Sequence, residues 1–166
     1  DFDADGNLWA FHSSLDRVTM IDVDKVGADG EVASVTYKMP KEIVTDDLWD
    51  VAFNAETQSF SGVSRANVEG GIGYLYQFDI SAVADGGEPT FTKTAVTSTL
   101  IDGELIDGMP RITFGAAIYD ADGTLYVAGN GGDHDMNDAT QEAGGIYRVV
   151  TNEATGEASL ELLATG

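Results

Sequence analysis

The chain has no cysteine, only 3 prolines and few positive charges among its 166 residues, and each shortage narrows its possible chemistry. Without cysteine there is no disulfide, no thiolate nucleophile and no cysteine-ligated zinc or iron–sulfur site. The 8 Lys and Arg residues stand against 29 Asp and Glu, a formal net charge of -21. Nucleic acids and anionic membrane surfaces both require a basic face, so neither is expected as a partner. The acidic surplus instead favours cations as partners, or a saline environment in which surface charge preserves solubility.

Long apolar runs and helical periodicity are missing too. No stretch approaches 18 consecutive apolar residues, so no helical membrane span is expected. The hydrophobic content of 43% nevertheless suffices for a packed core. Val, Thr, Ile, Tyr and Phe occur in short runs separated by Gly and Asp, a pattern typical of strands and turns. The sequence therefore predicts an all-β fold.

One pattern occurs three times along the chain: an apolar strand, a polar turn and a second apolar strand. The predicted hairpins are Phe2–Ala10, Val51–Gly62 and Ala117–Ala128. A further strand is expected after each hairpin, at Val18–Val23, Tyr74–Ile80 and Gly145–Val150. The first and last of these lead through a turn with a Gly-Glu pair into strands at Val32–Val35 and Ala158–Leu160. Recurrence of this kind indicates an internal repeat.

Four short antiparallel strands in a recurring order are typical of a β-propeller blade. A β-sandwich is the alternative, but it gives no reason for the hairpin to recur. Hairpins such as Asp120-Ala121-Asp122-Gly123, followed by strands such as Tyr147-Arg148-Val149, resemble the blades of lactonase-like, NHL-type and integrin-like propellers. The resemblance implies an all-β propeller with approximate blades over residues 1–40, 41–99 and 100–166.

The strand tally predicts about three four-stranded blades, with the first strand of the first blade falling before Asp1. Propellers close with about four to eight blades. We therefore expect the chain to be a processed or trimmed segment of a larger ring. Its partners would be the remainder of the propeller or a partner chain, with a protein or small-molecule ligand on the loop face.

The first hairpin turn predicts a calcium site. Carboxylates at Asp1, Asp3 and Asp5, followed by Gly6 and a ligand from Asn7, match the start of a calcium-binding loop. The Glu expected at the twelfth loop position is replaced by His12, so a calcium-binding strand–turn–strand fits better than a helix–loop–helix. A plain hairpin turn is the alternative interpretation.

Two other groups are candidate cation ligands. Asp120 and Asp122 repeat the turn, but Ile118 stands where the first carboxylate would be. The loop Gly129–Asp138 offers a second donor set on the opposite face, and a solvated loop is its alternative interpretation. That set is Asp133, His134, Asp135 and Asp138. Further polar residues expected on that loop face are His12, Asp46, Asp47, Arg65, Asn67, Glu69 and Arg111.

No Ser–His–Asp order, phosphate-binding glycine loop or HExxH motif is present. The leading hypothesis is therefore a binding or scaffolding segment of an extracellular or periplasmic propeller with structural calcium. The alternative is a fragment of a metal-dependent lactonase- or phosphatase-type propeller hydrolase, in which a cation and carboxylates would carry the chemistry.

Overall fold

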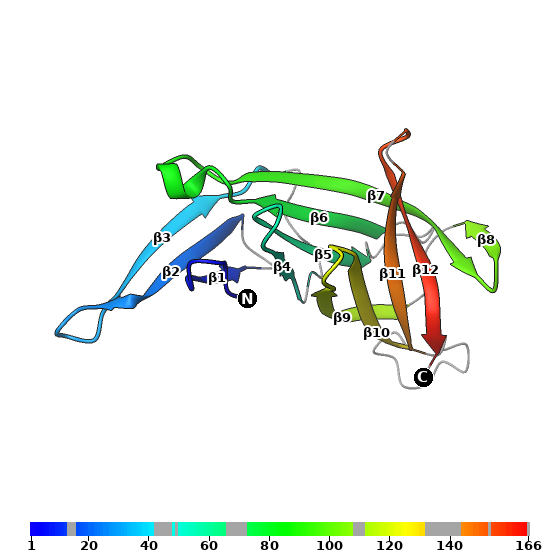
Figure 1. The fold of residues 1–166 in the computed structure, drawn as a ribbon, viewed down its shortest axis with the longest axis horizontal. Coiled ribbons are helices and arrows are strands. Elements are labelled where there is room, and N and C mark those ends of the chain that lie inside the picture. Colours follow the sequence, from blue (N-terminus) through cyan, green and yellow to red (C-terminus); the bar gives the residue numbers. More distant parts are fainter. Residues whose placement is uncertain are drawn as a thin grey trace.

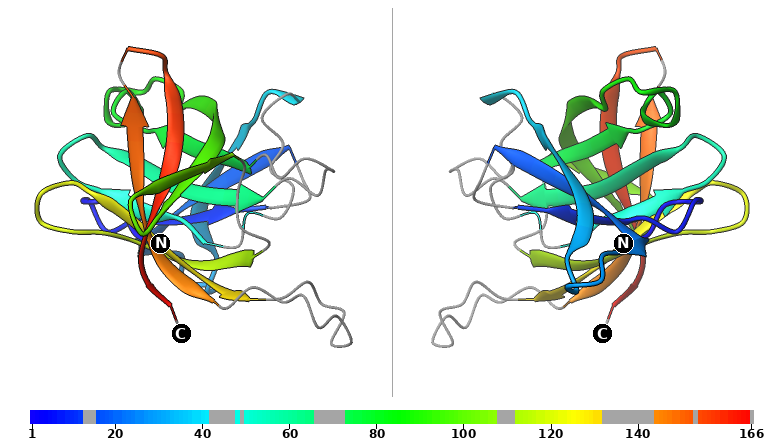
Figure 2. Two further views of the ribbon diagram at one scale, coloured as in Figure 1. Left: turned by 90° about the vertical axis from the view of Figure 1, so that its right-hand side faces the viewer. Right: turned by 90° about the vertical axis from the view of Figure 1, so that its left-hand side faces the viewer.

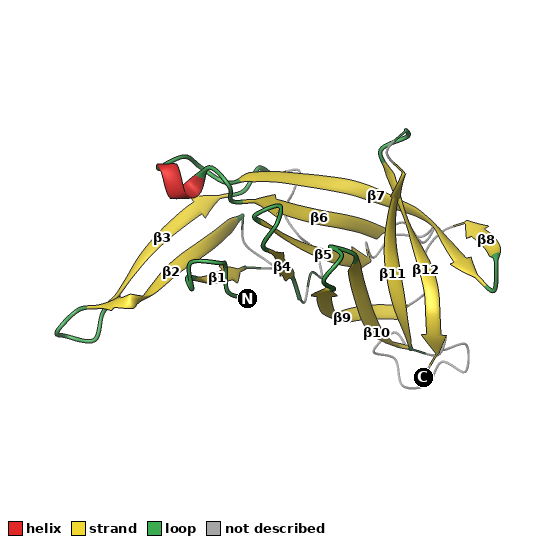
Figure 3. Ribbon diagram, viewed as in Figure 1, coloured by secondary structure: helices red, strands yellow, loops and turns green. Residues whose placement is uncertain are grey.

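The computed structural model describes residues 1–12, 16–41, 48, 50–65, 73–107, 112–131, 144–152 and 154–165. Strands make up nearly all the regular structure of these residues, together with a short 3₁₀-helix, η2, at Val83–Asp85 (Figure 3). The prediction of an all-β fold is thereby confirmed. None of the described helical turns has the length or apolar character needed to cross a membrane.

The N-terminal sheet consists of three antiparallel strands in the order β1-β2-β3. Its strands are β1 (Leu8–Phe11), β2 (Arg17–Val26) and β3 (Val32–Lys38). Phe2 forms an isolated antiparallel bridge with Leu8 across the first turn. Thus the first predicted hairpin is present, although only one residue pairs on its leading side.

The larger sheet contains two four-stranded antiparallel meanders. The first meander is β4 (Ala52–Asn54), β5 (Ser59–Arg65), β6 (Gly73–Asp79) and β7 (Thr90–Ile101). The second meander is β9 (Ile112–Tyr119), β10 (Leu125–Gly131), β11 (Gly145–Asn152) and β12 (Glu157–Thr165). A short strand, β8 (Glu104–Asp107), pairs with the end of β7. In Figure 1 the N-terminal sheet lies to the left, the first meander in the middle and the second meander to the right.

A parallel pairing between β7 and β12 joins the two meanders into one sheet. At the far ends of this sheet, β9 also contacts β4 and β5. Eight strands in the order β4-β5-β6-β7-β12-β11-β10-β9 therefore form a nearly closed, barrel-like sheet. The sequence pattern correctly predicts both meander hairpins and strands within β2, β3, β6, β11 and β12, but it gives no strand at β8. It does not predict the β7–β12 pairing, because propeller blades are expected to be separate sheets.

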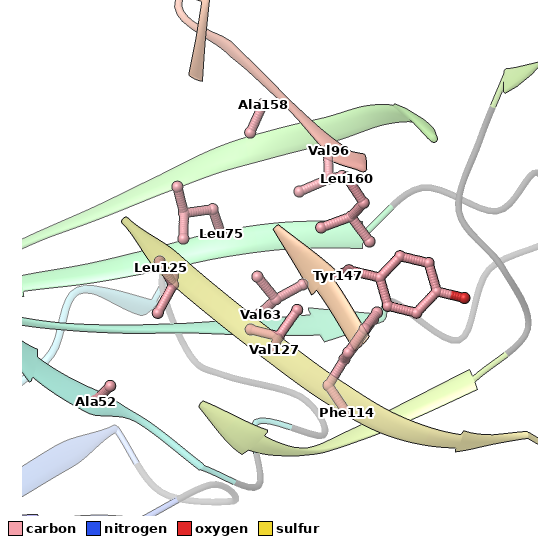
Figure 4. Close-up of a cluster of buried hydrophobic side chains, with 10 residues drawn as sticks. All are labelled: Ala52, Val63, Leu75, Val96, Phe114, Leu125, Val127, Tyr147, Ala158 and Leu160. Atoms are coloured by element: carbon pink, nitrogen blue, oxygen red, sulfur yellow. The ribbon is translucent and has the colours of Figure 1, made fainter. Parts of the chain in front are cut away.

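The first hydrophobic cluster fills the space enclosed by this barrel-like sheet. Val63 and Leu75 from the first meander face Val127 and Leu160 from the second, and all four are at most 3% exposed (Figure 4). Phe114 and Tyr147 meet edge to face at 5.8 Å in the same cluster. These contacts hold the two meanders together face to face.

The second hydrophobic cluster lies between the N-terminal sheet and the outer face of the first meander. Phe60 on β5 is its centre, since it is fully buried and its ring contacts three aromatic neighbours. Its ring centroid lies 5.8 Å from that of Trp9, 5.3 Å from that of Phe11 and 4.8 Å from that of Phe53. Alternation along the strands sends Phe60 to this cluster and Val63 to the first. The first meander is consequently buried on both faces.

We expect Phe60→Ala to lower the free energy of unfolding by about 3–5 kcal/mol, because it removes a large core ring and leaves a cavity. Urea denaturation followed by circular dichroism measures this change. Phe2→Ala is the matched control, because Phe2 is 51% exposed. Equal effects of the two substitutions would contradict the central position of Phe60 in the second cluster.

Candidate functional site

The carboxylate of Asp3 organises the first hairpin turn. Its Oδ1 accepts hydrogen bonds from the backbone N–H groups of Asp5 and Asn7, at 3.0 and 2.8 Å. Its Oδ2 accepts from Asn7 Nδ2 at 3.0 Å and from Trp9 Nε1 at 2.7 Å. Trp9 is 2% exposed, so Asp3 provides the partner that a buried indole N–H requires.

These contacts bear directly on the predicted calcium site. A carboxylate offers about four acceptor positions, and the four donors around Asp3 use them all. The carboxylate of Asp1 is also engaged, by the backbone N–H groups of Phe2 and Phe53. Among the described residues, no group of three or more His, Asp or Glu side chains is arranged to hold a metal ion. As arranged, the donor set of this turn does not fit a calcium ion.

The turn at Asp120 has the same construction. Its Oδ1 accepts from the N–H groups of Asp122 and Thr124, both at 2.9 Å, and its Oδ2 accepts from the Tyr126 hydroxyl at 3.0 Å. The Thr124 N–H and the Tyr126 hydroxyl lower the pKa of Asp120 below its usual value of 3.8. Reciprocally, the hydrogen bond to Asp120 raises the pKa of Tyr126 above 10.0. Asp120 therefore acts as a turn-forming acceptor, as Asp3 does.

Two further carboxylates connect consecutive parts of the fold. Oδ2 of Asp1 accepts from the N–H of Phe53 on β4 at 3.1 Å, which ties the N-terminus to the first meander. Oδ2 of Asp50 accepts from the N–H of Ala117 on β9 at 2.9 Å, which ties the first meander to the second. Part of the acidity of the chain thus satisfies backbone donors at sheet edges.

Of the remaining predicted site residues, the structure describes His12 and Arg65. His12 is half-buried and its Nε2 lies 3.4 Å from Thr19 Oγ1. Arg65 ends β5. The set Asp133, His134, Asp135 and Asp138 lies outside the described residues, as do Asp46, Asp47, Asn67, Glu69 and Arg111. The predicted metal site in the loop Gly129–Asp138 therefore stays a prediction.

A cleft of about 500 Å³ opens between the two meanders, on the side of the hairpin turns. Leu75, Leu125, Val149 and Val150 form the apolar part of its wall. Seven neutral side chains supply hydrogen-bonding groups: Asn54, Thr57, Ser59, Gln77, Tyr119, Thr124 and Thr151. The described lining includes no Asp or Glu, in contrast to the acidic surface of the chain. A volume of this size and a mixed wall are typical of small-molecule sites.

Two polar contacts shape this cleft. The guanidinium of Arg148 donates to Glu161, with Nε at 2.9 Å from Oε2, and this contact raises the pKa of Arg148. Burial raises the pKa of Tyr119 above 10.0, and the nearby Ser61 hydroxyl opposes that rise. Ser61 is fully buried on the inward side of β5, yet its Oγ makes no well-formed hydrogen bond. Ser61 therefore leaves a buried hydroxyl with unused hydrogen-bonding capacity next to Tyr119, which lines the cleft.

The cleft has no sequence motif, because its lining comes from six strands and two turns that are far apart in the sequence. A weak signal does exist. Ser59, Ser61 and Gln77 share the inward side of β5 and β6 with the buried residues Val63 and Leu75. Polar residues at such core-facing positions are uncommon unless they have partners.

No protein-family model, curated protein or solved structure matches this chain.

The Asp120–Tyr126 pair provides a test by titration. We expect Asp120→Asn to bring the raised pKa of Tyr126 back toward 10, measured by the ring Cζ chemical shift as the pH rises. Asp85→Asn on η2 is the control and should leave that pKa unchanged. Because the folded pKa of Asp120 is depressed, the stability from this pair is present above the unfolded carboxyl pKa near 3.9 and is lost as the pH falls below it. An unchanged Tyr126 titration in Asp120→Asn would contradict the pairing.

Proposed function

We propose that the chain is a binding or scaffolding segment of a β-propeller, with the N-terminal sheet and the two meanders as three consecutive blade-like units. The carrying observation is a shared cross-strand register. Trp9 pairs with Met20, Ser61 with Gln77, and Tyr126 with Arg148. The first residue of each pair directly follows Leu8, Phe60 or Leu125, and these three positions are equivalent in the predicted repeat.

The turn conformations support the same repeat. Gly6 and Gly123 stand two residues before Leu8 and Leu125, and their φ values are 82° and 76°. Gln58 stands at the same distance before Phe60 and also has a positive φ, 51°, which is uncommon for a residue with a side chain. The three turns project on the same side of the molecule (Figure 2). A left-handed residue at one fixed position in all three hairpins is expected of repeated units and is not required by a sandwich.

The binding role is assigned to the cleft between the two meanders. Its neutral donors and acceptors favour an uncharged, hydroxyl-rich ligand the size of a mono- or disaccharide. A metal ion is disfavoured there because the described lining offers no carboxylate, and Arg148 is already paired with Glu161. The loop face, where a ligand is predicted from the sequence, contributes no described residue to this cleft.

Binding can be tested with a panel of neutral mono- and disaccharides by saturation-transfer NMR. We expect one or more sugars to bind, and Gln77→Leu to weaken that binding by about 3- to 10-fold through the loss of hydrogen bonds. Thr36→Val, on the exposed strand β3, is the control and should leave affinity unchanged. Absence of binding across the panel, or equal effects of both variants, would sink the assignment.

An extracellular or periplasmic location is a further part of the proposal. The calcium site that the sequence predicts at Asp1, Asp3, Asp5 and Asn7 is not included in it, because the carboxylate of Asp3 is already fully hydrogen-bonded. An ion at this turn would have to replace hydrogen bonds to Asp3, including the one from Trp9. We therefore expect the melting temperature to stay within about 1 °C when calcium is exchanged for EGTA. A large rise with calcium that Asp5→Asn abolishes would instead establish the ion at this turn.

The hydrolase alternative stays a prediction. Its expected metal-binding loop lies largely outside the described residues, and no described observation favours it over a binding role.

A further inference from the structure

The N-terminal sheet and the two meanders each have two faces, and consecutive units contact each other through unlike faces. We call the face of the N-terminal sheet that carries Trp9 and Met20 its "front" and the opposite face its "back". The faces of the meanders are named by the equivalent register positions. The front of the N-terminal sheet packs against the first meander at Phe60 and Phe78. By the register equivalence, Phe60 corresponds to Leu8, so the first meander receives this contact on its back.

The second interface repeats this arrangement. The first meander presents Val63 and Leu75, on its front, to Leu125 and Val127 of the second meander. Leu125 also corresponds to Leu8, so the second meander is again contacted on its back. Two consecutive interfaces are therefore both front to back, a head-to-tail arrangement that can generate rings.

Among the described residues, two faces are then not covered by another unit: the front of the second meander and the back of the N-terminal sheet. The front of the second meander exposes large apolar side chains, with Ile118 65%, Ile146 48% and Val150 40% exposed. At its centre, Arg148 and Glu161 neutralise each other's charge. The back of the N-terminal sheet carries Leu8 and Ile21, which face each other across β1 and β2.

We propose that the front of the second meander docks on the back of the N-terminal sheet of a second copy of this chain. This docking rests on the proposed three-unit repeat and identifies the partner chain of that proposal as a second copy. One chain carries both complementary faces, and they are the same pair of faces that meets twice within it. Two copies supply six units and two such contacts, which falls within the four to eight units that close a propeller.

The internal interfaces also indicate which residues should meet. Trp9 contacts Phe60 across the first front-to-back interface, with ring centroids 5.8 Å apart. Tyr126 is the equivalent of Trp9, and Leu8 is the equivalent of Phe60. Tyr126 of one copy is thus expected to lie against Leu8 of the second copy.

Sedimentation equilibrium of the full chain tests the association. We expect a dimer whose Kd falls as NaCl rises, because each copy carries a net charge of -21 and salt screens their repulsion. Ile118→Lys should raise the Kd at least ~10-fold by placing a charge in the apolar contact. Val35→Lys is the matched control, since Val35 is 46% exposed and pairs with Met20 on the front of the N-terminal sheet, a face that the docking does not use. It should leave the Kd unchanged.

Cross-linking tests the direction of the contact. Because the chain has no cysteine, Tyr126→Cys and Leu8→Cys variants each carry one thiol. With a short bis-maleimide, a mixture of the two variants should give a covalent dimer, whereas neither variant alone should do so. Cross-linking within a single variant would overturn the head-to-tail contact, and a monomer at all concentrations and salt levels would overturn the association.

Failure of this inference can be told apart from failure of the three-unit repeat. Hydrogen exchange of β5 and β6 reports burial of the first meander within one chain. Slow exchange in a monomer would reject the docking and leave the repeat in place. Fast exchange in these strands would reject the repeat and, with it, the docking that rests on it.

Discussion

The fold depends on the burial of the first meander from both sides. A half-buried antiparallel sheet alternates apolar and polar residues, whereas β5 and β6 send apolar side chains to both faces. Phe60 needs the aromatic side chains of the N-terminal sheet, and Val63 needs the apolar inward residues of the second meander. Neither neighbour could be removed without exposing one of these faces, so the three parts of the chain are mutually dependent.

The acidic composition is partly structural. Asp3 and Asp120 each complete a turn and accept a hydrogen bond from the aromatic side chain six residues later. Asp1 accepts a backbone donor from β4, and Asp50 accepts one from β9. A short carboxylate can satisfy several donors without a bulky apolar contact. Such positions do not need a cation, which explains how Asp-rich turns can resemble calcium loops and yet use their oxygens otherwise.

The local features of the fold are predictable from sequence because they depend on neighbours along the chain. The short apolar runs locate both meander hairpins and the strands that follow them, and the Asp-Gly pair marks the turn of the second meander hairpin. The β7–β12 pairing and the cleft depend on residues brought together over long sequence distances, for which no local pattern exists. The role of Asp3 cannot be predicted from a motif either. Calcium ligation and hydrogen bonding to Trp9 both require the same carboxylate in the same turn.

The positive φ shared by Gly6, Gln58 and Gly123 has a consequence for how such a chain can vary. The two glycines meet this backbone requirement at little steric cost, while Gln58 meets it with a side chain that bonds back to Ala55. The hairpin geometry therefore tolerates divergence of its residues as long as the backbone turns the same way. The three hairpins can differ in residue type and still reverse the chain in the same way, and the middle hairpin lacks the Asp-Gly pair that the other two contain.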